Sequence, residues 1–249
     1  MSNSDLIKNE VRYVGRDLEA MSFAVNYHRW ILSVFKPYLG KRLVEVGAGT
    51  GSFSELLLEH SYESLALVEP STAMFSTLKK RIERLQPVVP IEIYNSVFAD
   101  AAPQIKARHQ PDSVIYVNVL EHIRDDEMEL RLVREILDLN GRVFIFVPAL
   151  PQLYGRFDET IGHFRRYTKD DLENKCRRNG LDILKSTYFD LAGVIPWWVQ
   201  FRLLKVRALK PEAVKFYDTY VVPLTKAVET VLKPPLGKNL LVVAEKSDM

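Results

Sequence analysis

A chain of 249 residues with 47% apolar and 27% charged residues can bury the core of one soluble domain with additions. The formal net charge of +2 gives no sign of a nucleic-acid partner, and the single cysteine excludes an internal disulfide framework. The polar N-terminus predicts no secretory signal, and the uncharged apolar stretch at 191–201 is too short to span a bilayer. We therefore expect a soluble, cytoplasmic protein that binds no nucleic acid.

Short apolar runs alternate with amphipathic segments from Lys41 onward. The apolar runs, typical of strands buried on both faces, lie at 41–47, 64–69, 91–95, 112–118 and 141–147. Helical patterns lie between them at 52–60, 71–85 and 124–139. Ser71 is a potential N-cap of the second helix, and Asn140-Gly141 is a C-cap signal after the third. This alternation predicts right-handed crossovers and a doubly wound α/β sheet that is mostly parallel.

The segments that flank this alternation predict additions to the same sheet. An amphipathic helix is expected over 17–39, ending near Pro37, and irregular sequence rich in aromatic and charged residues occupies 148–168. The remaining chain predicts a helix at 169–179, a strand at 181–189, two apolar helices at 191–209 and 212–232, and a final strand at 239–246. Because no linker is apparent, we expect one domain.

Three glycines at alternate positions in "VEVGAGTGSF" (44–53) mark a place where a ligand approaches the backbone closely. A phosphate-binding P-loop would end in Gly-Lys-Ser/Thr, whereas residues 51–53 are Gly-Ser-Phe. The dinucleotide fingerprint needs a glycine at its sixth position, where Ser52 stands. Glu69 ends the second strand, where a carboxylate can accept hydrogen bonds from both hydroxyls of a ribose. The turn and Glu69 together predict a ligand that carries a ribose.

Three motifs together resemble one enzyme family. "LVEVGAGTGSFS" (43–54), "LVEPS" (67–71) and "VNVLEHIRD" (117–125) are similar to the class I S-adenosylmethionine-dependent methyltransferases, in particular the small-molecule branch called type 11 or type 12. The likeness covers roughly residues 20 to 190, and "LEHI" after the fourth strand is not usual in dehydrogenases. It implies a Rossmann-like seven-stranded sheet with an N-terminal helix and a C-terminal helical lid. It also implies S-adenosylmethionine as cofactor and methyl transfer to an oxygen or nitrogen of a small molecule, such as a natural product, a sugar or a quinone-like, lipophilic compound.

The resemblance assigns a part of the single domain to each task. It implies N-terminal cap helices at 1–40, a cofactor-binding core at 41–148, an acceptor loop and lid helices at 149–236, and the closing strand at 237–249. The residues that would contact the cofactor are Tyr27, Glu45, Gly47, Ala48, Gly49, Gly51, Glu69, Pro70, Ser71, Met74, Ser96, Val97, Phe98, Asn118, Val119, Leu120 and His122. S-adenosylmethionine carries no phosphate, which fits a glycine turn without a lysine.

Two histidines are candidates for a general base, because imidazole takes up a proton near neutral pH. His122 follows the fourth strand at the cofactor end, although a histidine there can equally be a helix-start residue packed on the sheet. His163 lies in the insertion expected over the acceptor, although it can also be a surface loop residue. The residues expected to bind the acceptor are Tyr154, His163, Arg165, Arg166, Tyr167 and Trp197. One of the two arginines is expected to pair with Asp158, Glu159, Asp170 or Asp171 and only to fix the loop.

Relatives in the ubiquinone-pathway branch carry a metal-binding Glu-x-x-Glu-His pattern after strand four. Here Asn118 replaces the first glutamate and leaves Glu121 and His122, so we expect no metal.

The segment 191–210 has Trp197, Trp198 and Phe201 followed by Arg202, Lys205, Arg207 and Lys210, a pattern typical of helices on membrane surfaces. A lid helix whose aromatic residues line the acceptor pocket is the interpretation we prefer. Two other functions stay open: a cofactor-binding regulatory homologue without turnover, and an NAD-dependent oxidoreductase.

Overall fold

A computed structural model describes residues 24–206 and 208–247. Seven strands form one sheet in the order β3-β2-β1-β4-β5-β7-β6. The strands are β1 (Arg42–Val46), β2 (Ser64–Val68), β3 (Ile91–Tyr94), β4 (Ser113–Val117), β5 (Arg142–Pro148), β6 (Leu181–Phe189) and β7 (Asn239–Lys246). The first five pair in parallel, whereas β7 runs antiparallel to both β5 and β6. The predicted α/β fold with a mostly parallel seven-stranded sheet is confirmed.

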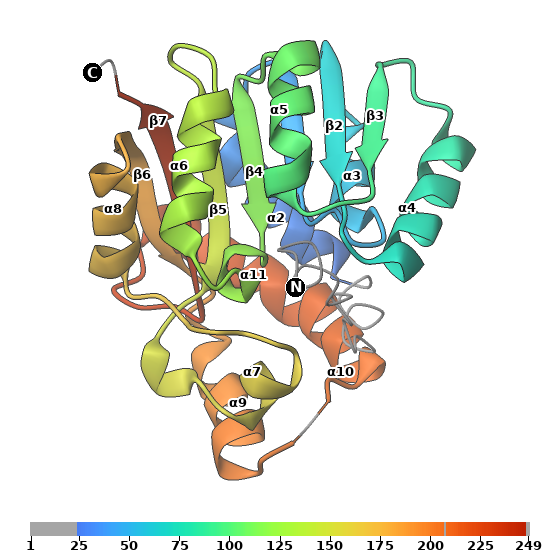
Figure 1. Ribbon diagram of the computed structural model, residues 1–249. Helices are drawn as coiled ribbons and strands as arrows, with labels where there is room; N and C mark the ends of the chain where they lie inside the picture. Colours follow the sequence, from blue (N-terminus) through green and yellow to red (C-terminus); the bar gives the residue numbers. More distant parts are fainter. Residues whose placement is uncertain (1–23, 207, 248–249) are drawn as a thin grey trace, which may run out of the picture.

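Helices cover both faces of the sheet (Figure 1). The helices are α2 (Val25–Phe35), α3 (Ser52–Leu57), α4 (Thr72–Leu85), α5 (Phe98–His109), α6 (Asp126–Ile136), α7 (Arg156–Thr160), α8 (Lys169–Arg178), α9 (Val194–Trp197), α10 (Pro211–Phe216) and α11 (Val222–Val231). Short 3₁₀ turns are η1 (Lys36–Tyr38), η2 (Leu120–His122) and η3 (Pro151–Leu153), and π-helical turns are η4 (Trp198–Leu203) and η5 (Tyr217–Val221).

Two apolar layers form because side chains alternate between the faces of each strand. On one face, Val44 and Val46 of β1 pack with buried residues of α5, α6 and α8. On the other face, Leu43 of the same strand packs with α2, α3, α4 and Val222 of α11. Burial on both faces explains why the strands read as uninterrupted apolar runs.

The carboxyl ends of the parallel strands lie at one edge of the sheet, where open α/β sheets bind ligands. Because β7 is antiparallel, its first residue Asn239 pairs with Pro148, the last residue of β5. The start of β7 therefore lies at the same edge as the ends of β1, β2, β4 and β5.

Several local predictions differ from the structure. No helix is predicted at 98–109, where the structure has α5 with Pro103 inside it. Of the helix expected at 17–39, residues 17–23 lie outside the described residues, and α2 begins at Val25. Ser71 is the residue at the N-cap position of α4, but its side chain makes no capping hydrogen bond, and its backbone N–H donates to Glu69. Within the described residues, no helix is both long enough and apolar enough to cross a bilayer.

Candidate functional site

The glycine turn between β1 and α3 needs glycine for two reasons. Gly47, Gly49 and Gly51 all have positive φ angles, of 68°, 58° and 83°, which side chains rarely allow. A Cβ atom on Gly47 would also lie 2.5 Å from Cγ2 of Val119, and one on Gly51 would lie 2.8 Å from Leu78. The N–H groups of Gly47 and Ala48 both donate to the Val68 carbonyl, which ties the turn to the end of β2.

Glu69 links the two turns at the ends of β1 and β2. One carboxylate oxygen accepts from the Gly49 N–H at 2.8 Å, and the other accepts from the Ser71 N–H at 2.7 Å. Burial raises the pKa of Glu69, and these two N–H groups oppose that shift. Since each carboxylate oxygen has a further lone pair, Glu69 keeps two acceptor positions for a ligand.

Glu45 is the second acid at this edge and lies near the end of β1. Its carboxyl is buried and accepts from the Ser54 hydroxyl at 2.5 Å. Burial raises the pKa of Glu45 to about 8, although the Ser54 hydrogen bond acts in the opposite direction. A buried acid without a cationic partner is costly when ionised, so this position favours a ligand that brings a positive charge.

A cavity of about 480 Å³ lies over this edge and extends from the glycine turn to the loop after β5. Thirteen of the residues predicted to contact the cofactor line it: Tyr27, Glu45, Gly47, Ala48, Gly49, Glu69, Pro70, Ser71, Met74, Val97, Asn118, Val119 and His122. Of the residues predicted to bind the acceptor, His163, Arg166 and Trp197 line it.

At the far end of the cavity, Asp158 of α7 holds two basic side chains. Its Oδ1 lies 2.9 Å from Nδ1 of His163 and 2.9 Å from Nε of Arg166. Burial opposes ionisation of Asp158, but hydrogen bonds from His163 and the charge of Arg166 outweigh it, so its pKa is lowered. An ionised carboxylate only accepts, which makes Nδ1 of His163 the donor and leaves the Nε2 lone pair available.

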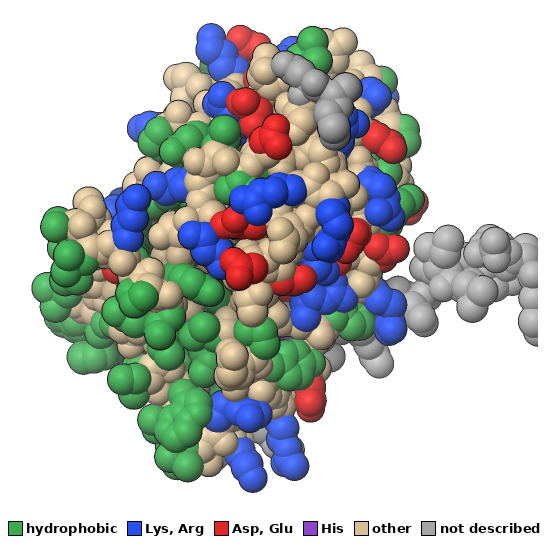
Figure 2. Space-filling model, turned by 90° about the vertical axis from the view of Figure 1, so that its left-hand side faces the viewer, with side chains coloured by type: hydrophobic (Ala, Val, Ile, Leu, Met, Phe, Trp, Pro, Cys, Tyr) green, Lys and Arg blue, Asp and Glu red, His purple; other side chains and the backbone are tan. Residues whose placement is uncertain are grey.

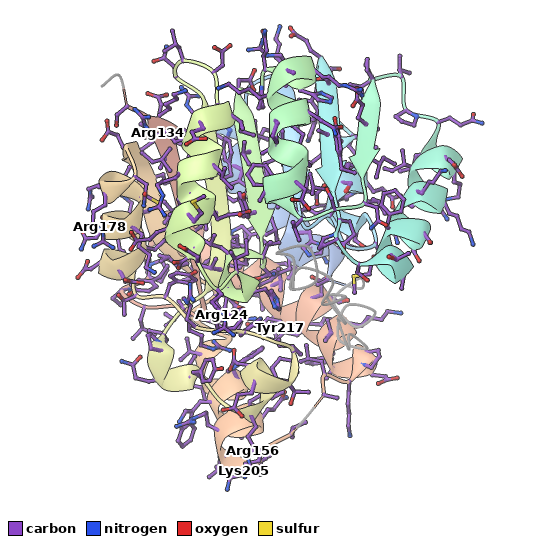
Figure 3. The ribbon with its side chains drawn as sticks, in the orientation of Figure 1. Arg124, Arg134, Arg156, Arg178, Lys205 and Tyr217 are labelled. Carbon is purple, nitrogen blue, oxygen red and sulfur yellow. The ribbon has the colours of Figure 1, made fainter. Side chains whose placement is uncertain are left out.

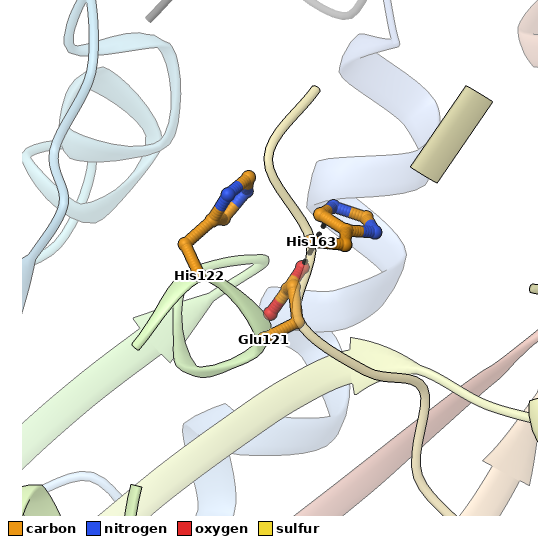
Figure 4. Close-up of side chains that lie close together, drawn as sticks. All are labelled: Glu121, His122 and His163. Atoms are coloured by element: carbon orange, nitrogen blue, oxygen red, sulfur yellow. Dashed lines mark ion pairs between the residues drawn. The ribbon is translucent and has the colours of Figure 1, made fainter. Parts of the chain in front are cut away.

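His163, Glu121 and His122 lie close together beside this pair (Figure 4). Nε2 of His163 is 3.7 Å from the Glu121 carboxyl, and the two histidine rings meet edge to face with centroids 4.6 Å apart. Both carboxyl oxygens of Glu121 are buried and lack a hydrogen-bond partner among the described residues. Burial raises the pKa of Glu121 to about 8 and lowers that of His122 to about 3. Burial also lowers the pKa of His163, so both imidazoles are neutral at pH 7.

These three side chains each offer one ligand atom, and the atoms lie within 4.8 Å of one another. Glu121 and His122 are the two residues that remain of the Glu-x-x-Glu-His pattern, and the structure places His163 beside them as a third potential ligand. The expectation that no metal is needed stays a prediction.

Seven predicted site residues lie outside the cavity lining. Gly51 shapes the glycine turn, Ser96 lies on the loop between β3 and α5, and Phe98 and Leu120 are buried in the core. The Tyr154 hydroxyl donates to the His163 carbonyl, and Arg165 reaches away to Asp126 at 2.7 Å.

The Tyr167 ring is fully buried, and its hydroxyl donates to Asp126 at 2.8 Å. Tyr167 and Arg165 therefore fix the loop, whereas Arg166 is the arginine that pairs with Asp158. One arginine does pair with Asp158, as expected, but it is the cavity residue Arg166, and Arg165 pairs with Asp126, which was not among the four acids named.

Other cavity residues were missed by the sequence analysis. Phe157 belongs to α7, Ile161 directly follows that helix, and Leu209 follows η4. Lys238 directly precedes β7, and Asn239 is its first residue. Lys238 lies 3.1 Å from Asp190 and its ammonium is 5.4 Å from the centre of the Trp197 ring. The antiparallel direction of β7 places Lys238 and Asn239 at the ligand edge, and the apolar pattern at 239–246 predicts the strand but not its direction.

Comparison with family models matches residues 20–186 to a family described as "Methyltransferase domain". The chain belongs to this methyltransferase domain family. The family resemblance that the three motifs indicate is therefore confirmed. Comparison with the curated protein sequences gave no match.

Solved structures similar to this methyltransferase domain share its fold. A SAM-dependent methyltransferase from Archaeoglobus fulgidus is 17% identical, with a TM-score of 0.57 over 92% of this chain and 98% of that one. Phosphoethanolamine N-methyltransferase 2 of Haemonchus contortus, solved with S-adenosyl-L-methionine, is 12% identical, with a TM-score of 0.58 over 91% of this chain and 57% of that one. The [4+2]-cyclase SpnF is 14% identical, with a TM-score of 0.57 over 90% and 80%. Because a cyclase shares the fold, the reaction has to be argued from the site.

Proposed function

We propose that this protein transfers a methyl group from S-adenosylmethionine to an oxygen or nitrogen atom of a small molecule. One observation carries the proposal: a single cavity joins the glycine turn and the anchored Glu69 to the Asp158–His163 pair. The first end suits a nucleoside with an amino-acid tail, and the second suits proton removal from an acceptor. Membership of the methyltransferase domain family supports the same reaction class.

The cavity chemistry supports S-adenosylmethionine as the cofactor. Glu69 would accept hydrogen bonds from the ribose hydroxyls through the lone pairs that Gly49 and Ser71 leave unused. Glu45 would face the positively charged part of the methionine moiety. The glycine turn has no lysine that could bind a phosphate, and S-adenosylmethionine carries no phosphate group.

Methyl transfer is an in-line displacement, in which the acceptor atom bonds to the methyl carbon while the carbon–sulfur bond breaks. The bonding pair stays on sulfur and gives S-adenosylhomocysteine. With a hydroxyl acceptor, the proton would pass to Nε2 of His163, whose orientation is fixed by Asp158. Holding the acceptor in line in a cavity that excludes water supplies much of the acceleration.

Isothermal titration with S-adenosylhomocysteine and with NAD separates this proposal from an oxidoreductase. We expect binding of S-adenosylhomocysteine only, and binding of NAD alone would refute the proposal that S-adenosylmethionine is the cofactor.

A screen of small-molecule acceptors with a homocysteine-release readout then tests turnover. In that screen, His163→Gln should lower kcat at unchanged cofactor affinity, while His60→Gln, outside the cavity, serves as the control. Cofactor binding without turnover on any hydroxyl or amine acceptor would favour the regulatory homologue.

A further inference from the structure

Exposed apolar side chains are concentrated in one part of the chain. Of nineteen large apolar side chains exposed among the described residues, twelve lie between 191 and 236. We call these twelve the apolar face: Leu191, Ile195, Trp198, Leu203, Leu204, Phe216, Tyr220, Leu224, Val228, Val231, Leu232 and Leu236. In Figure 2, hydrophobic side chains gather over the lower part of the molecule, where α9 lies in Figure 1, with Lys and Arg at its margin. Soluble proteins rarely expose so many apolar side chains together without a partner.

The helix formed by α10, η5 and α11 presents a continuous apolar stripe to solvent. Phe216, Tyr220, Leu224 and Val228 recur every four residues and are 56–71% exposed. The opposite side of the helix is fastened to the protein, because buried Asp218 accepts from the backbone N–H groups of Asn26 and Tyr27. The stripe is thus held outward by a fixed helix and does not complete the core.

Segment 194–204 adds a second set of apolar residues with a clear division between its faces. Trp197 and Phe201 turn inward and pack against the Phe157 ring, with centroids 5.4 and 4.4 Å away. Trp198, Leu203 and Leu204 turn outward and are 48–65% exposed. Of the aromatic residues that the sequence pattern placed on a membrane-facing helix, only Trp198 lies on the exposed side.

The charges around the apolar face are mostly positive. Within the segment 191–236, which carries the apolar face, Lys205, Lys210 and Lys215 are exposed. Figure 3 shows Lys205 at the lower tip of the molecule. Arg207 lies outside the described residues. Of the acidic residues in the segment, Asp218 is buried and Glu229 accepts from the backbone of Asp190 and Leu191. Glu212 is the exposed acid among the described residues of the segment.

We propose that the apolar face docks on the surface of a bilayer that contains anionic lipids. Apolar and aromatic side chains would enter the headgroup boundary, and the lysines would lie at the level of the lipid phosphates. A second copy of this chain fits less well, because symmetric pairing would bring the lysines of both copies together.

Docking would bring the reaction cavity next to the lipid. Trp197 and Leu209 line the cavity, while Trp198 and Leu204 of the same segment belong to the apolar face. The wall of the cavity is therefore also the layer that meets the membrane. The proposal stands apart from the proposed methyl transfer, since it rests on the outer surface of these helices.

Vesicle flotation tests the proposal with the full chain. The parent protein should float with vesicles of phosphatidylcholine and phosphatidylglycerol in equal parts, and bind far less to phosphatidylcholine alone. Leu224→Asp should lower the bound fraction about tenfold. Leu139→Asp is the matched control, because both leucines are 71% exposed but Leu139 precedes β5 at the other edge of the sheet. A double variant, Lys205→Glu with Lys210→Glu, should lose the preference for phosphatidylglycerol.

Circular dichroism and S-adenosylhomocysteine titration show whether each variant keeps its fold and cavity. A parent protein that stays in the vesicle-free fraction with both vesicle types overturns the proposal. So does equal loss of flotation in Leu224→Asp and Leu139→Asp. A parent dimer in sedimentation that Leu224→Asp converts to a monomer, without vesicle binding by either, assigns the apolar face to a second copy instead.

Discussion

Replacing Glu69 by alanine tests the central contact of the proposed cofactor site. The carboxylate has two tasks in the structure: it accepts from Gly49 and Ser71, and it keeps further lone pairs directed into the cavity. Loss of hydrogen bonds to a charged acceptor costs about 1.5–3 kcal/mol each in favourable cases. Part of that loss falls on the free protein, whose two N–H groups then lose their acceptor. We therefore expect S-adenosylhomocysteine binding to weaken by about 1–3 kcal/mol, or roughly 5- to 150-fold.

The assay is isothermal titration of parent and variant at the same pH and ionic strength. Thermal unfolding of the variant shows how much of the change belongs to the loosened turn. Glu83→Ala on α4 is a control for removal of a glutamate, because Glu83 is 63% exposed and lies outside the cavity. Equal affinity of the parent and Glu69→Ala would show that the ribose does not lie against the end of β2.

Four further predictions follow from the geometry. Gly47→Ala should cost more stability than Gly162→Ala, because both have positive φ but only at Gly47 does a Cβ meet a side chain at 2.5 Å; equal losses in chemical denaturation would contradict the close approach. Burial raises the pKa of Glu121 from 4.5 to about 8, so the contribution of this group to stability falls as the pH rises between those values. Between pH 5 and pH 8, the free energy of unfolding of Glu121→Gln should therefore rise by about 1–3 kcal/mol relative to that of the parent, as measured by urea titration. Burial lowers the pKa of His163, so kcat for a hydroxyl acceptor should hold at pH 7 and fall only below pH 6.5, and His163→Gln should lack that acidic limb. Activity should survive dialysis against a chelator, whereas a loss that zinc or magnesium restores would show that Glu121, His122 and His163 hold a metal.

The strands were predictable because burial on both faces leaves a strong signal in the sequence. Each of the seven predicted strand segments matches a strand of the structure to within one residue at either end. Glycines with positive φ and an acid after the second strand are local signals too, so Gly47 and Glu69 could be named before any fold was known. The helix at 98–109 was missed, and Pro103 lies inside it, where a proline lacks the backbone N–H that an interior helical turn needs.

The pairing of charged side chains could not be predicted in the same way. Several acids lie near Arg165 and Arg166 in the sequence, and only the path of the loop decides that Arg166 reaches Asp158 while Arg165 reaches Asp126. Tyr167 looked suitable for an acceptor because aromatic and basic neighbours surround it. Its hydroxyl instead bonds the distant Asp126, a contact across 41 residues that no local pattern carries.

The charges of the cavity bear on the proposed cationic cofactor. Arg166 and Lys238 are already paired, with Asp158 and Asp190, so neither is an unmatched positive charge. Glu45 and Glu121 have no such partner, and burial raises the pKa of each to about 8. An ammonium or sulfonium group entering beside Glu45 supplies the missing charge and favours ionisation of that acid. In the proposed reaction, methyl transfer would remove the sulfonium charge, and a proton taken up by His163 would restore a positive charge at the other end of the cavity. The unpaired acids of the cavity thus support the proposed cationic cofactor over a neutral one.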